Sequence, residues 1–191
     1  MRLILASQSP RRQSILKDAG FDFETIPSSF DESSIKPTTK EEYVMTLAYH
    51  KAKAVFMQHQ DAIVIGADTI VYIKHENKVS YLGKPRDSHH AKEMLELLSS
   101  RTHQVLTGVA IISKNTEETF YTVSNVTFKI LSDRDIEDYI QTKEPFDKAG
   151  AYAIQGEGYK LIERYDGDFF TIMGLPIKEV QQALKKIKTS D

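Results

Sequence analysis

The sequence predicts a mixed α/β fold, and three observations support that prediction. Continuous apolar runs, the pattern of strands buried on both faces, occur at LILA near the N-terminus and at AIVIGADTIVYI in residues 62–73. Segments with helical periodicity precede and follow these runs. Two further strand patterns, at 104–113 and 119–130, flank the polar turn KNTEE and predict an antiparallel pair. Together they favour one mixed sheet, folded into two lobes with a cleft between them.

The first sixty residues are predicted to alternate between strands and helices. A buried strand over 2–7 leads to a helix over 10–19, with Ser9 as its N-cap, Pro10 at its first position and Gly20 just beyond its end. Three more segments follow: a second strand at 21–27, a hydroxyl-rich loop at 28–40 and a helix at 41–58. Polar loops of this kind often carry functional residues.

The rest of the chain supplies the long strands and three more helices. The turn HENK and the segment VSYLGKP after it are expected to complete a hairpin with the strand over 62–73. The predicted helices, which have amphipathic patterns or cap signals, span 88–98, 133–142 and 176–187. The segment EPFDKAGAYAIQGEG, residues 144–158, is irregular and rich in glycine.

Length, charge and cysteine content exclude several classes of protein. A chain of 191 residues is about the size of one domain, and no repeat or linker divides it, so residues 1–191 are predicted to form a single domain. The lack of cysteine excludes disulfides and thiolate metal sites and fits a reducing, cytoplasmic location. A net charge of −2 with interspersed signs gives no basic field for nucleic acid. The apolar runs are too short for a bilayer or a signal peptide, so no membrane partner is expected.

Arg11 and Arg12 fall in the first turn of the first predicted helix, where cations are unfavourable. Unpaired N–H groups and the helix dipole make this end positive, so each cation there costs roughly 0.3–1 kcal/mol. One explanation is a phosphate-like anion bound by the free amides, Ser7, Ser9 and the two guanidinium groups. The other is neutralisation by solvent or a nearby carboxylate. These ten residues leave both explanations open.

Asp68 is the strongest single candidate for a functional residue. It interrupts a strand whose flanking residues are apolar, and an ionised carboxylate in such a place costs several kcal/mol unless it is paired, hydrogen-bonded or bound to a metal. Buried carboxylates of this kind tend to be functional. Gly66 indicates either a bulge or the close approach of another backbone. The structural alternative is a carboxylate exposed at a bulge or held by backbone N–H groups.

Two acidic loop residues become candidate metal ligands only in combination with Asp68. Asp31 and Glu32 are ordinary loop residues by themselves, but a second carboxylate beside Asp68 would let the pair hold Mg²⁺ through oxygens and waters. The six histidines have no metal-ligand spacing and are expected to be structural or exposed; they are His50, His59, His75, His89, His90 and His103.

Several lysines and one glutamine could contact a nucleotide. Lys51 and Lys84 are candidate phosphate ligands, while Lys53 is better explained as part of a solvated helix face. Asp147 and Lys148 precede a run of small residues that permits close approach of a ligand. Gln155 offers both a donor and an acceptor to a base edge, although a satisfied loop glutamine explains it equally well.

The order of these motifs resembles the Maf family of nucleotide pyrophosphatases. The resemblance spans nearly the whole chain and rests on eight blocks: LILASQSPRR at 3–12, DE at 31–32, KAKAV at 51–55, IVIGADT at 63–69, LGKP at 82–85, THQVLTGV at 102–109, EPFDKAGAYAIQG at 144–156 and MGLP at 173–176. It implies an elongated, mixed α/β sheet in two lobes with a deep central cleft, similar to the inosine triphosphate pyrophosphatases. It also implies hydrolysis of a nucleoside triphosphate to monophosphate and pyrophosphate with Mg²⁺ or Mn²⁺.

The resemblance also implies roles for individual residues. Asp68 matches the catalytic proton acceptor, and Arg11, Thr69 and Gln155 match the specificity positions. The other implied cleft residues are Ser7, Arg12, Glu32, Lys51, Lys84, Asp147 and Lys148. A metal would be held by Asp68, with Glu32 as a second ligand. Because a carboxylate bound directly to a metal has a lowered proton affinity, tight ligand and strong base are alternative roles for Asp68.

Three motifs favour the family branch that acts on dTTP and UTP. SPRR, GADT and IQG match this branch, whereas the branch for 7-methyl-GTP carries an aromatic residue, GSDQ and a glutamate at the corresponding places. Ser100, Ala153 and Thr171 depart from the usual family residues. The expected role is housekeeping of nucleotide pools, and the expected assembly is a homodimer, as is frequent in the family. The alternative is a nucleotide-binding regulator of cell division or septum formation that acts through a protein partner.

Overall fold

The chain forms two compact units that share long strands. The computed structural model describes residues 2–36 and 38–190, with side chains described as far as Ile187. Unit 1 comprises Met1–Thr69, Thr107–Thr122 and Phe169–Asp191, and unit 2 comprises Ile70–Leu106 and Val123–Asp168. The two-lobe division expected from the sequence is therefore confirmed. The cleft and the single domain stay predictions.

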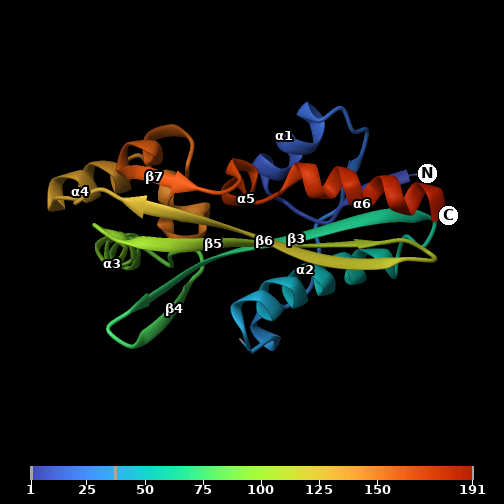
Figure 1. Ribbon diagram of the computed structural model, residues 1–191, viewed down its shortest axis with the longest axis horizontal. Coiled ribbons are helices and arrows are strands. Elements are labelled where there is room, and N and C mark those ends of the chain that lie inside the picture. Colours follow the sequence, from blue (N-terminus) through green and yellow to red (C-terminus); the bar gives the residue numbers. More distant parts are fainter. Residues whose placement is uncertain (1, 37, 191) are drawn as a thin grey trace. The chain divides into compact units, whose positions relative to one another are not determined.

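Helices and strands are interspersed along the chain rather than grouped into separate segments (Figure 1). The strands are β1 (Arg2–Leu5), β2 (Glu24–Thr25), β3 (Ala62–His75), β4 (Lys78–Leu82), β5 (Thr102–Ile112), β6 (Glu117–Phe128) and β7 (Ile162–Asp166). The α-helices are α1 (Pro10–Asp18), α2 (Lys40–Phe56), α3 (Ser88–Leu98), α4 (Asp133–Gln141), α5 (Phe169–Met173) and α6 (Ile177–Ser190). Short 3₁₀ helices are η1 (Glu32–Ser34), η2 (Glu144–Asp147), η3 (Ala149–Ala151) and η4 (Gly156–Leu161).

The sheet is mixed, as predicted. Its strand order is β2-β1-β3-β5-β6-β7, with β4 paired to β3 off this path. β1 runs parallel to β2 and β3, whereas β4 is antiparallel to β3 and β7 is antiparallel to β6. Backbone hydrogen bonds from Ser113 to Thr116 and from Phe128 to Arg101 join β5 and β6 as the expected antiparallel pair.

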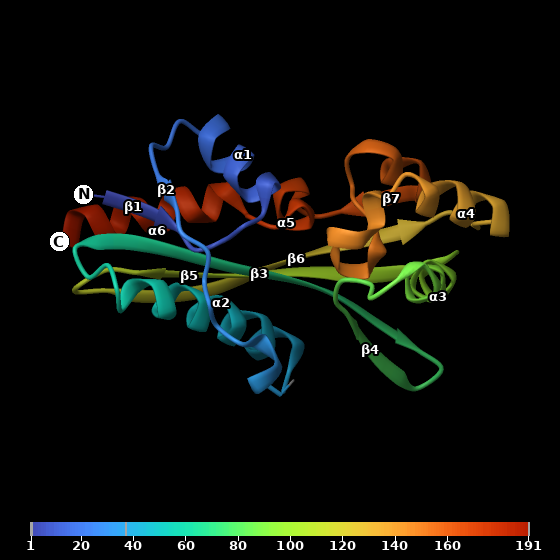
Figure 2. The same ribbon diagram turned by 180° about the vertical axis from the view of Figure 1, so that it is seen from behind.

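In unit 1, helices cover both faces of the sheet. Helices α1 and α6 lie on one face and α2 lies on the other (Figures 1 and 2). Because successive strand residues point to opposite faces, one strand serves both layers. Ala62 and Val64 of β3 join a buried cluster with Ala52 of α2. Ile63 between them faces the other layer and lines a hollow with Leu184 of α6.

Two glycines allow α2 to lie directly on the sheet. A Cβ at Gly66 would meet the carbonyl oxygen of Ala48 and would lie 2.6 Å from the nitrogen of Ala52, both in α2. A Cβ at Gly108 of β5 would lie 2.6 Å from the carbonyl carbon of Val44. Both distances are shorter than a side chain tolerates, so of the two explanations for Gly66 the structure shows the close backbone approach.

Unit 2 contains the β3–β4 hairpin, α3, α4 and the glycine-rich segment. Glu76 and Asn77 both have positive φ, of 47° and 62°, as a two-residue hairpin turn requires. His103 is buried, and its Nε2 lies 2.7 Å from the hydroxyl of Tyr152. The rings of both residues also pack against Phe128. His103 is therefore structural, as expected.

The structure differs from the sequence predictions at four places, one of which is the unpredicted short helix α5. The strand predicted over 21–27 is reduced to the two residues of β2, and the polar loop contains the short helix η1. Strand β7 was not predicted, because most of its residues are exposed and have no hydrophobic strand pattern. It is a strand because it pairs with β6. The other predicted helices and strands differ from the observed ones by at most three residues at either end. None of the described helices has the length and apolar character needed to cross a membrane.

Candidate active site

A charged cluster in unit 1 is centred on Lys51. Its ammonium group forms an ion pair with Oδ1 of Asp68 in β3 and lies 2.8 Å from Oε1 of Glu32 in η1. The side chains of Lys51 and Asp68 are 13% and 11% exposed, whereas that of Glu32 is 55% exposed. Asp68 is thus a buried, paired carboxylate, and the alternative of an acid exposed at a bulge does not describe it.

The geometry of β3 and α2 explains this pairing. Gly66 and Asp68 are two residues apart and point to the same face of the strand, the face that α2 covers. Gly66 lets the backbone of α2 approach at Ala52. Lys51, the residue before Ala52, is thereby held beside Asp68. Asp31 caps η1 by accepting a hydrogen bond from the Ser33 amide, and this orders the turn from which Glu32 reaches Lys51.

Opposing effects act on the protonation of Asp68. Burial raises the pKa of the Asp68 carboxyl, and the positive charges of Lys51 and Arg12 partly offset that rise. The negative charge of Glu32 adds to it. A carboxyl group with a raised pKa is a stronger base than an ordinary aspartate, which suits it to the role of proton acceptor.

Arg12 is held on the opposite face of β3. Its Nε donates to the carbonyl oxygen of Gly174 at 2.8 Å, Nη1 donates to Ser7 at 3.2 Å and Nη2 donates to Thr69 at 3.0 Å. All three acceptors are neutral, so these bonds fix the guanidinium without cancelling its charge. Burial lowers the pKa of Arg12, and the charge of Asp68 opposes that decrease. Arginine nevertheless stays protonated in proteins.

The N-terminus of α1 matches its prediction from the sequence. Ser9 is the N-cap and Pro10 occupies the first turn, but Ser9 makes no side-chain cap bond. Instead, the Ser7 hydroxyl accepts hydrogen bonds from the Ser9 amide and from Arg12. Arg11 is half-buried and close enough to Arg12 to lower its pKa. A fixed guanidinium, a second cation and a helix N-terminus therefore lie together, an arrangement that favours an anion.

The remaining predicted site residues lie in unit 2. The Gly150 amide donates to the carbonyl oxygen of Gly83 at 3.0 Å, so the segments that carry Lys84 and Lys148 are adjacent. Lys84 is exposed, whereas the half-buried Lys148 is fixed by an ion pair with Asp147 and by a 2.8 Å hydrogen bond to the Glu144 carbonyl.

The specificity candidate of unit 2, Gln155, is exposed immediately before η4. Glu144 organises the loop that follows it, because its carboxylate accepts from the amides of Glu157 and Gly158 and from the Tyr139 hydroxyl. We did not identify Glu144 from the sequence. The only signal was an acidic residue that opens the block EPFDKAGAYAIQG, and nothing in that block pointed to backbone contacts.

Thr107 was also missed. It is fully buried in β5, and its hydroxyl lies 2.9 Å from that of Thr69. A threonine in the apolar run VLTGVAII was the available signal, since a buried hydroxyl needs a partner.

The donor set of the cluster fits a divalent cation. Asp68 and Glu32 offer the hard carboxylate oxygens that Mg²⁺ and Mn²⁺ prefer, and both already converge on one positive charge, that of Lys51. Within residues 2–36 and 38–190, no group of three or more His, Cys, Asp or Glu side chains could hold a metal by itself. Water and substrate phosphates would have to complete the coordination, as is usual for Mg²⁺.

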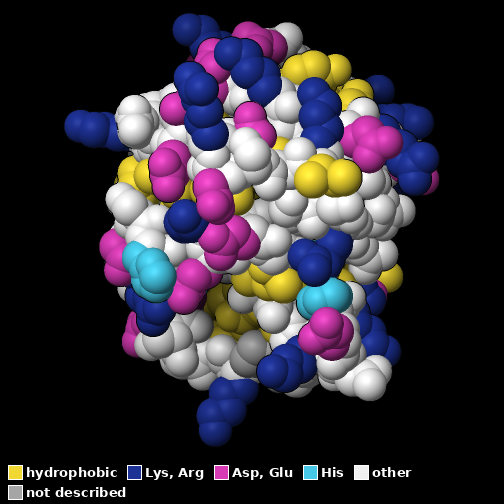
Figure 3. All heavy atoms as spheres, turned by 90° about the vertical axis from the view of Figure 1, so that its left-hand side faces the viewer, with side chains coloured by type: hydrophobic (Ala, Val, Ile, Leu, Met, Phe, Trp, Pro, Cys, Tyr) yellow, Lys and Arg dark blue, Asp and Glu magenta, His cyan; other side chains and the backbone are white. Residues whose placement is uncertain are grey.

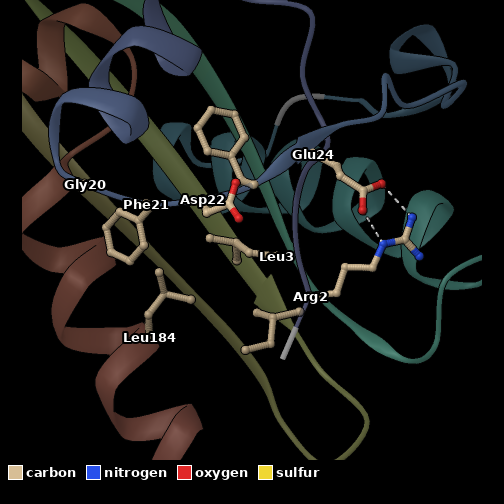
Figure 4. A pocket seen from close by; sticks show the side chains of 9 residues that line it. Arg2, Leu3, Gly20, Phe21, Asp22, Glu24 and Leu184 are labelled. Carbon is tan, nitrogen blue, oxygen red and sulfur yellow. Dashed lines mark hydrogen bonds and ion pairs between the residues drawn. The ribbon is translucent and has the colours of Figure 1, made fainter.

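Two other parts of the surface were considered as binding sites: a hollow in unit 1 and the face shown in Figure 3. A hollow of about 450 Å³ in unit 1 is lined by Leu3, Phe21 and Leu184, with the ion pair of Arg2 and Glu24 at its edge (Figure 4). None of the predicted site residues lines it. Figure 3 shows one face of the molecule, on which basic and acidic side chains are mixed without a broad area of one sign.

The chain is similar over nearly its whole length to one protein family and to several curated proteins. The family described as Maf-like protein matches residues 2–187. The dTTP/UTP pyrophosphatase of Acholeplasma laidlawii (strain PG-8A) is 51% identical over 186 residues, which cover 96% of this chain and 95% of that protein. The dTTP/UTP pyrophosphatase of Clostridioides difficile (strain 630) is 46% identical over 188 residues, which cover 97% and 95%. That of Bacillus velezensis is 48% identical over 185 residues, which cover 97% and 96%.

Solved structures with much lower identity were also found. A nucleoside-triphosphatase, or dITP/XTP pyrophosphatase, from Mycobacterium abscessus is 10% identical with a TM-score of 0.47, and the match covers 100% of this chain and 97% of that one. The Ham1 protein of Staphylococcus aureus is 16% identical with a TM-score of 0.49, and the match covers 85% and 80%. The family model matches residues 2–187, and the three curated relatives are 46–51% identical over 96–97% of the sequence. The chain therefore belongs to the Maf family.

Proposed function

We propose that this protein is a nucleoside triphosphate pyrophosphatase that hydrolyses dTTP and UTP to the monophosphate and pyrophosphate. The observation that carries the proposal is the buried Asp68 carboxylate, paired with Lys51 on one face of β3 while Arg12 is fixed on the other. The names of the three relatives, all dTTP/UTP pyrophosphatases at 46–51% identity, support the same reaction and the same substrates.

Each residue of the cluster has a role in this proposal. Asp68 accepts the proton of the water that attacks the α-phosphate, while the bond from that phosphorus to the bridging oxygen breaks. Arg12 and Lys51 offset the charge that develops on the pyrophosphate leaving group. Ser7 holds Arg12 and the start of α1 in place for phosphate binding.

Further residues bind and select the nucleotide in this proposal. Lys84, Asp147 and Lys148 contribute to phosphate binding, and Arg11, Thr69 and Gln155 determine which base is accepted. Asp68 and Glu32 are also the candidate ligands of Mg²⁺ or Mn²⁺, which when bound would polarise phosphate oxygens; tight metal binding by Asp68 is the alternative to its role as base. The cytoplasmic location and the homodimer belong to the same proposal.

The test is an assay of the purified protein with Mg²⁺ and, separately, dTTP, UTP, CTP, ATP, GTP and 7-methyl-GTP, in which pyrophosphate and orthophosphate are both measured. Pyrophosphate from dTTP and UTP that Asp68→Asn does not release would support the reaction and the branch. Nucleotide binding without any pyrophosphate release by the wild-type protein would contradict the proposal and favour the regulator of cell division.

A further inference from the structure

A chain of hydrogen bonds runs from Arg12 into the core of unit 1. Arg12 Nη2 donates to the Thr69 hydroxyl at 3.0 Å, which lies 2.9 Å from the Thr107 hydroxyl. Thr107 in turn lies 2.7 Å from the backbone carbonyl oxygen of Thr171. Thr107 and Thr171 are fully buried, whereas Thr69 at the outer end is partly exposed.

The Thr171 carbonyl at the buried end fixes which group donates and which accepts in every hydrogen bond of this series. A carbonyl oxygen only accepts hydrogen bonds, so the single hydroxyl proton of Thr107 must be donated to Thr171. Thr107 has no second proton, and its contact with Thr69 must therefore be one in which Thr69 donates. The reverse orientation would leave two bare lone pairs facing each other 2.7 Å apart at a buried carbonyl.

This direction decides what Thr69 can offer to a ligand. Its one proton is donated to Thr107, and one of its two lone pairs accepts from Arg12. The lone pair that is left can only accept. A triphosphate carries acceptor oxygens and no donors at neutral pH, so Thr69 is unsuited to bind the phosphates and suited to a donor on the nucleoside.

We infer that Thr107 is a positioning residue for substrate selection: by taking the Thr69 hydroxyl proton, it makes Thr69 an obligate acceptor that selects a hydrogen-bond donor on the nucleoside. The inference rests on the proposed function. The donor is either the N3–H of uracil or thymine, which cytosine lacks, or a sugar hydroxyl. Both sources share the same chemistry, and substrate analogues distinguish them.

The experiment compares kcat/KM for pyrophosphate release by the wild-type protein, Thr107→Val and Thr107→Ser. The substrates are UTP, 3-deaza-UTP, in which C–H replaces N3–H, and 2′-deoxy- and 3′-deoxy-UTP. Thr107→Val preserves shape but frees the Thr69 proton, so we expect the preference for UTP over the matching analogue to fall about fivefold, the factor equivalent to one neutral hydrogen bond. Thr107→Ser, which retains the hydroxyl, is expected to keep the wild-type preference.

A double variant separates positioning from a general structural effect. If Thr107 acts through Thr69, then Thr69→Val and Thr69→Val/Thr107→Val have the same preference. A change in the 3-deaza-UTP ratio assigns the donor to the base, and a change in a deoxy-UTP ratio assigns it to the sugar; either supports the inference. Unchanged ratios in folded Thr107→Val overturn it.

The wild-type protein gives a test that does not depend on the folding of any variant. Equal kcat/KM for UTP and all three analogues would also overturn the inference, because no donor would then be selected. Failure of the proposed function looks different, since the wild-type protein would release no pyrophosphate from any nucleotide.

Discussion

The Lys51 ammonium pairs with the Asp68 carboxylate at the place where α2 lies directly on β3. A buried acid of this kind is stabilised by its partner rather than by water, and the removal of either charge has a large effect on the other. The pair therefore links the packing of unit 1 to the protonation of its central carboxylate.

Replacing Asp68 with asparagine tests its role as proton acceptor. Asparagine keeps the size and can accept a hydrogen bond from Lys51, but it does not accept a proton. We expect kcat for pyrophosphate release to fall at least about 100-fold, in line with the loss of a general base. The matched control is Asp61→Asn, a side chain that is 73% exposed, and it is expected to retain full activity. Wild-type turnover of Asp68→Asn would exclude Asp68 as the base.

Replacing Lys51 with methionine removes the charge and keeps most of the aliphatic stem. Lys51 lowers the pKa of Asp68, so its loss raises that pKa further. The base is then protonated over a wider acidic range, and we expect the acidic limb of the pH profile of kcat/KM to move to higher pH. Lys53→Met, which breaks an exposed pair with Glu117, serves as control. Coincident acidic limbs would show that Asp68 is not the titrating group.

Replacing Gly66 with alanine tests the contact between α2 and β3. The new methyl group would overlap the α2 backbone at Ala48 and Ala52, which cannot yield as a flexible side chain would. We expect a loss of about 2–3 kcal/mol in the free energy of unfolding, measured with urea. Gly83→Ala is the control, since nothing lies within 4 Å of its added Cβ. Equal stability of the two variants would contradict the close packing.

Replacing Arg12 with lysine tests the three-point anchor of the guanidinium. Lysine retains the charge but lacks the planar fork that bonds Gly174, Ser7 and Thr69 together. We expect kcat/KM for UTP to fall about tenfold or more, because both phosphate binding and transition-state charge stabilisation depend on the fork, while the variant still folds. The exposed Arg134→Lys provides the comparison, because that side chain is 90% exposed in α4. An unchanged kcat/KM would remove Arg12 from the phosphate site.

Sequence reasoning reached the main elements of the fold because their signals are local. The apolar run around Asp68, Pro10 at the start of α1 and the turn HENK each report on their own strand, helix or hairpin. The short strand β2 and the exposed strand β7 were not predicted well, because pairing with β1 and β6 defines them. Such pairing leaves little trace in the hydrophobic pattern.

The candidate site shows the same division. Asp68 could be identified because an isolated carboxylate in an apolar strand is costly. Its ion pair with Lys51 depends on how α2 is oriented across β3. The periodicity of apolar residues in the sequence does not encode that orientation. Thr107 and Glu144 were missed for a related reason, since each acts on groups distant in the sequence: Thr107 on the Thr171 carbonyl, and Glu144 on the amides of η4.

His103 predicts how stability depends on pH. Burial lowers the pKa of its imidazole to about 3, whereas in the unfolded chain the usual value of 6.5 applies. Below pH 6.5 the unfolded state therefore binds a proton that the folded state does not bind, and acid favours unfolding. Above pH 6.5 neither state is protonated at this position, and the effect is absent. The contribution of His103 to the free energy of unfolding should fall by up to about 1.4 kcal/mol for each pH unit between 6.5 and 3.

His103→Gln isolates this effect, because glutamine can still bond the Tyr152 hydroxyl but does not titrate. We expect the wild-type protein to be the more stable of the two at pH 7.5, and its advantage over the variant to shrink steadily at pH 6.0, 5.0 and 4.5 in urea unfolding. The control is His89→Gln, which alters a side chain that is 82% exposed and should leave the acid dependence close to that of the wild type. Parallel curves for the wild type and His103→Gln would mean that the buried imidazole takes up its proton in the folded state. The hydrogen bond with Tyr152 and the packing against Phe128 would then have to tolerate a charge, contrary to the enclosure of that ring in unit 2.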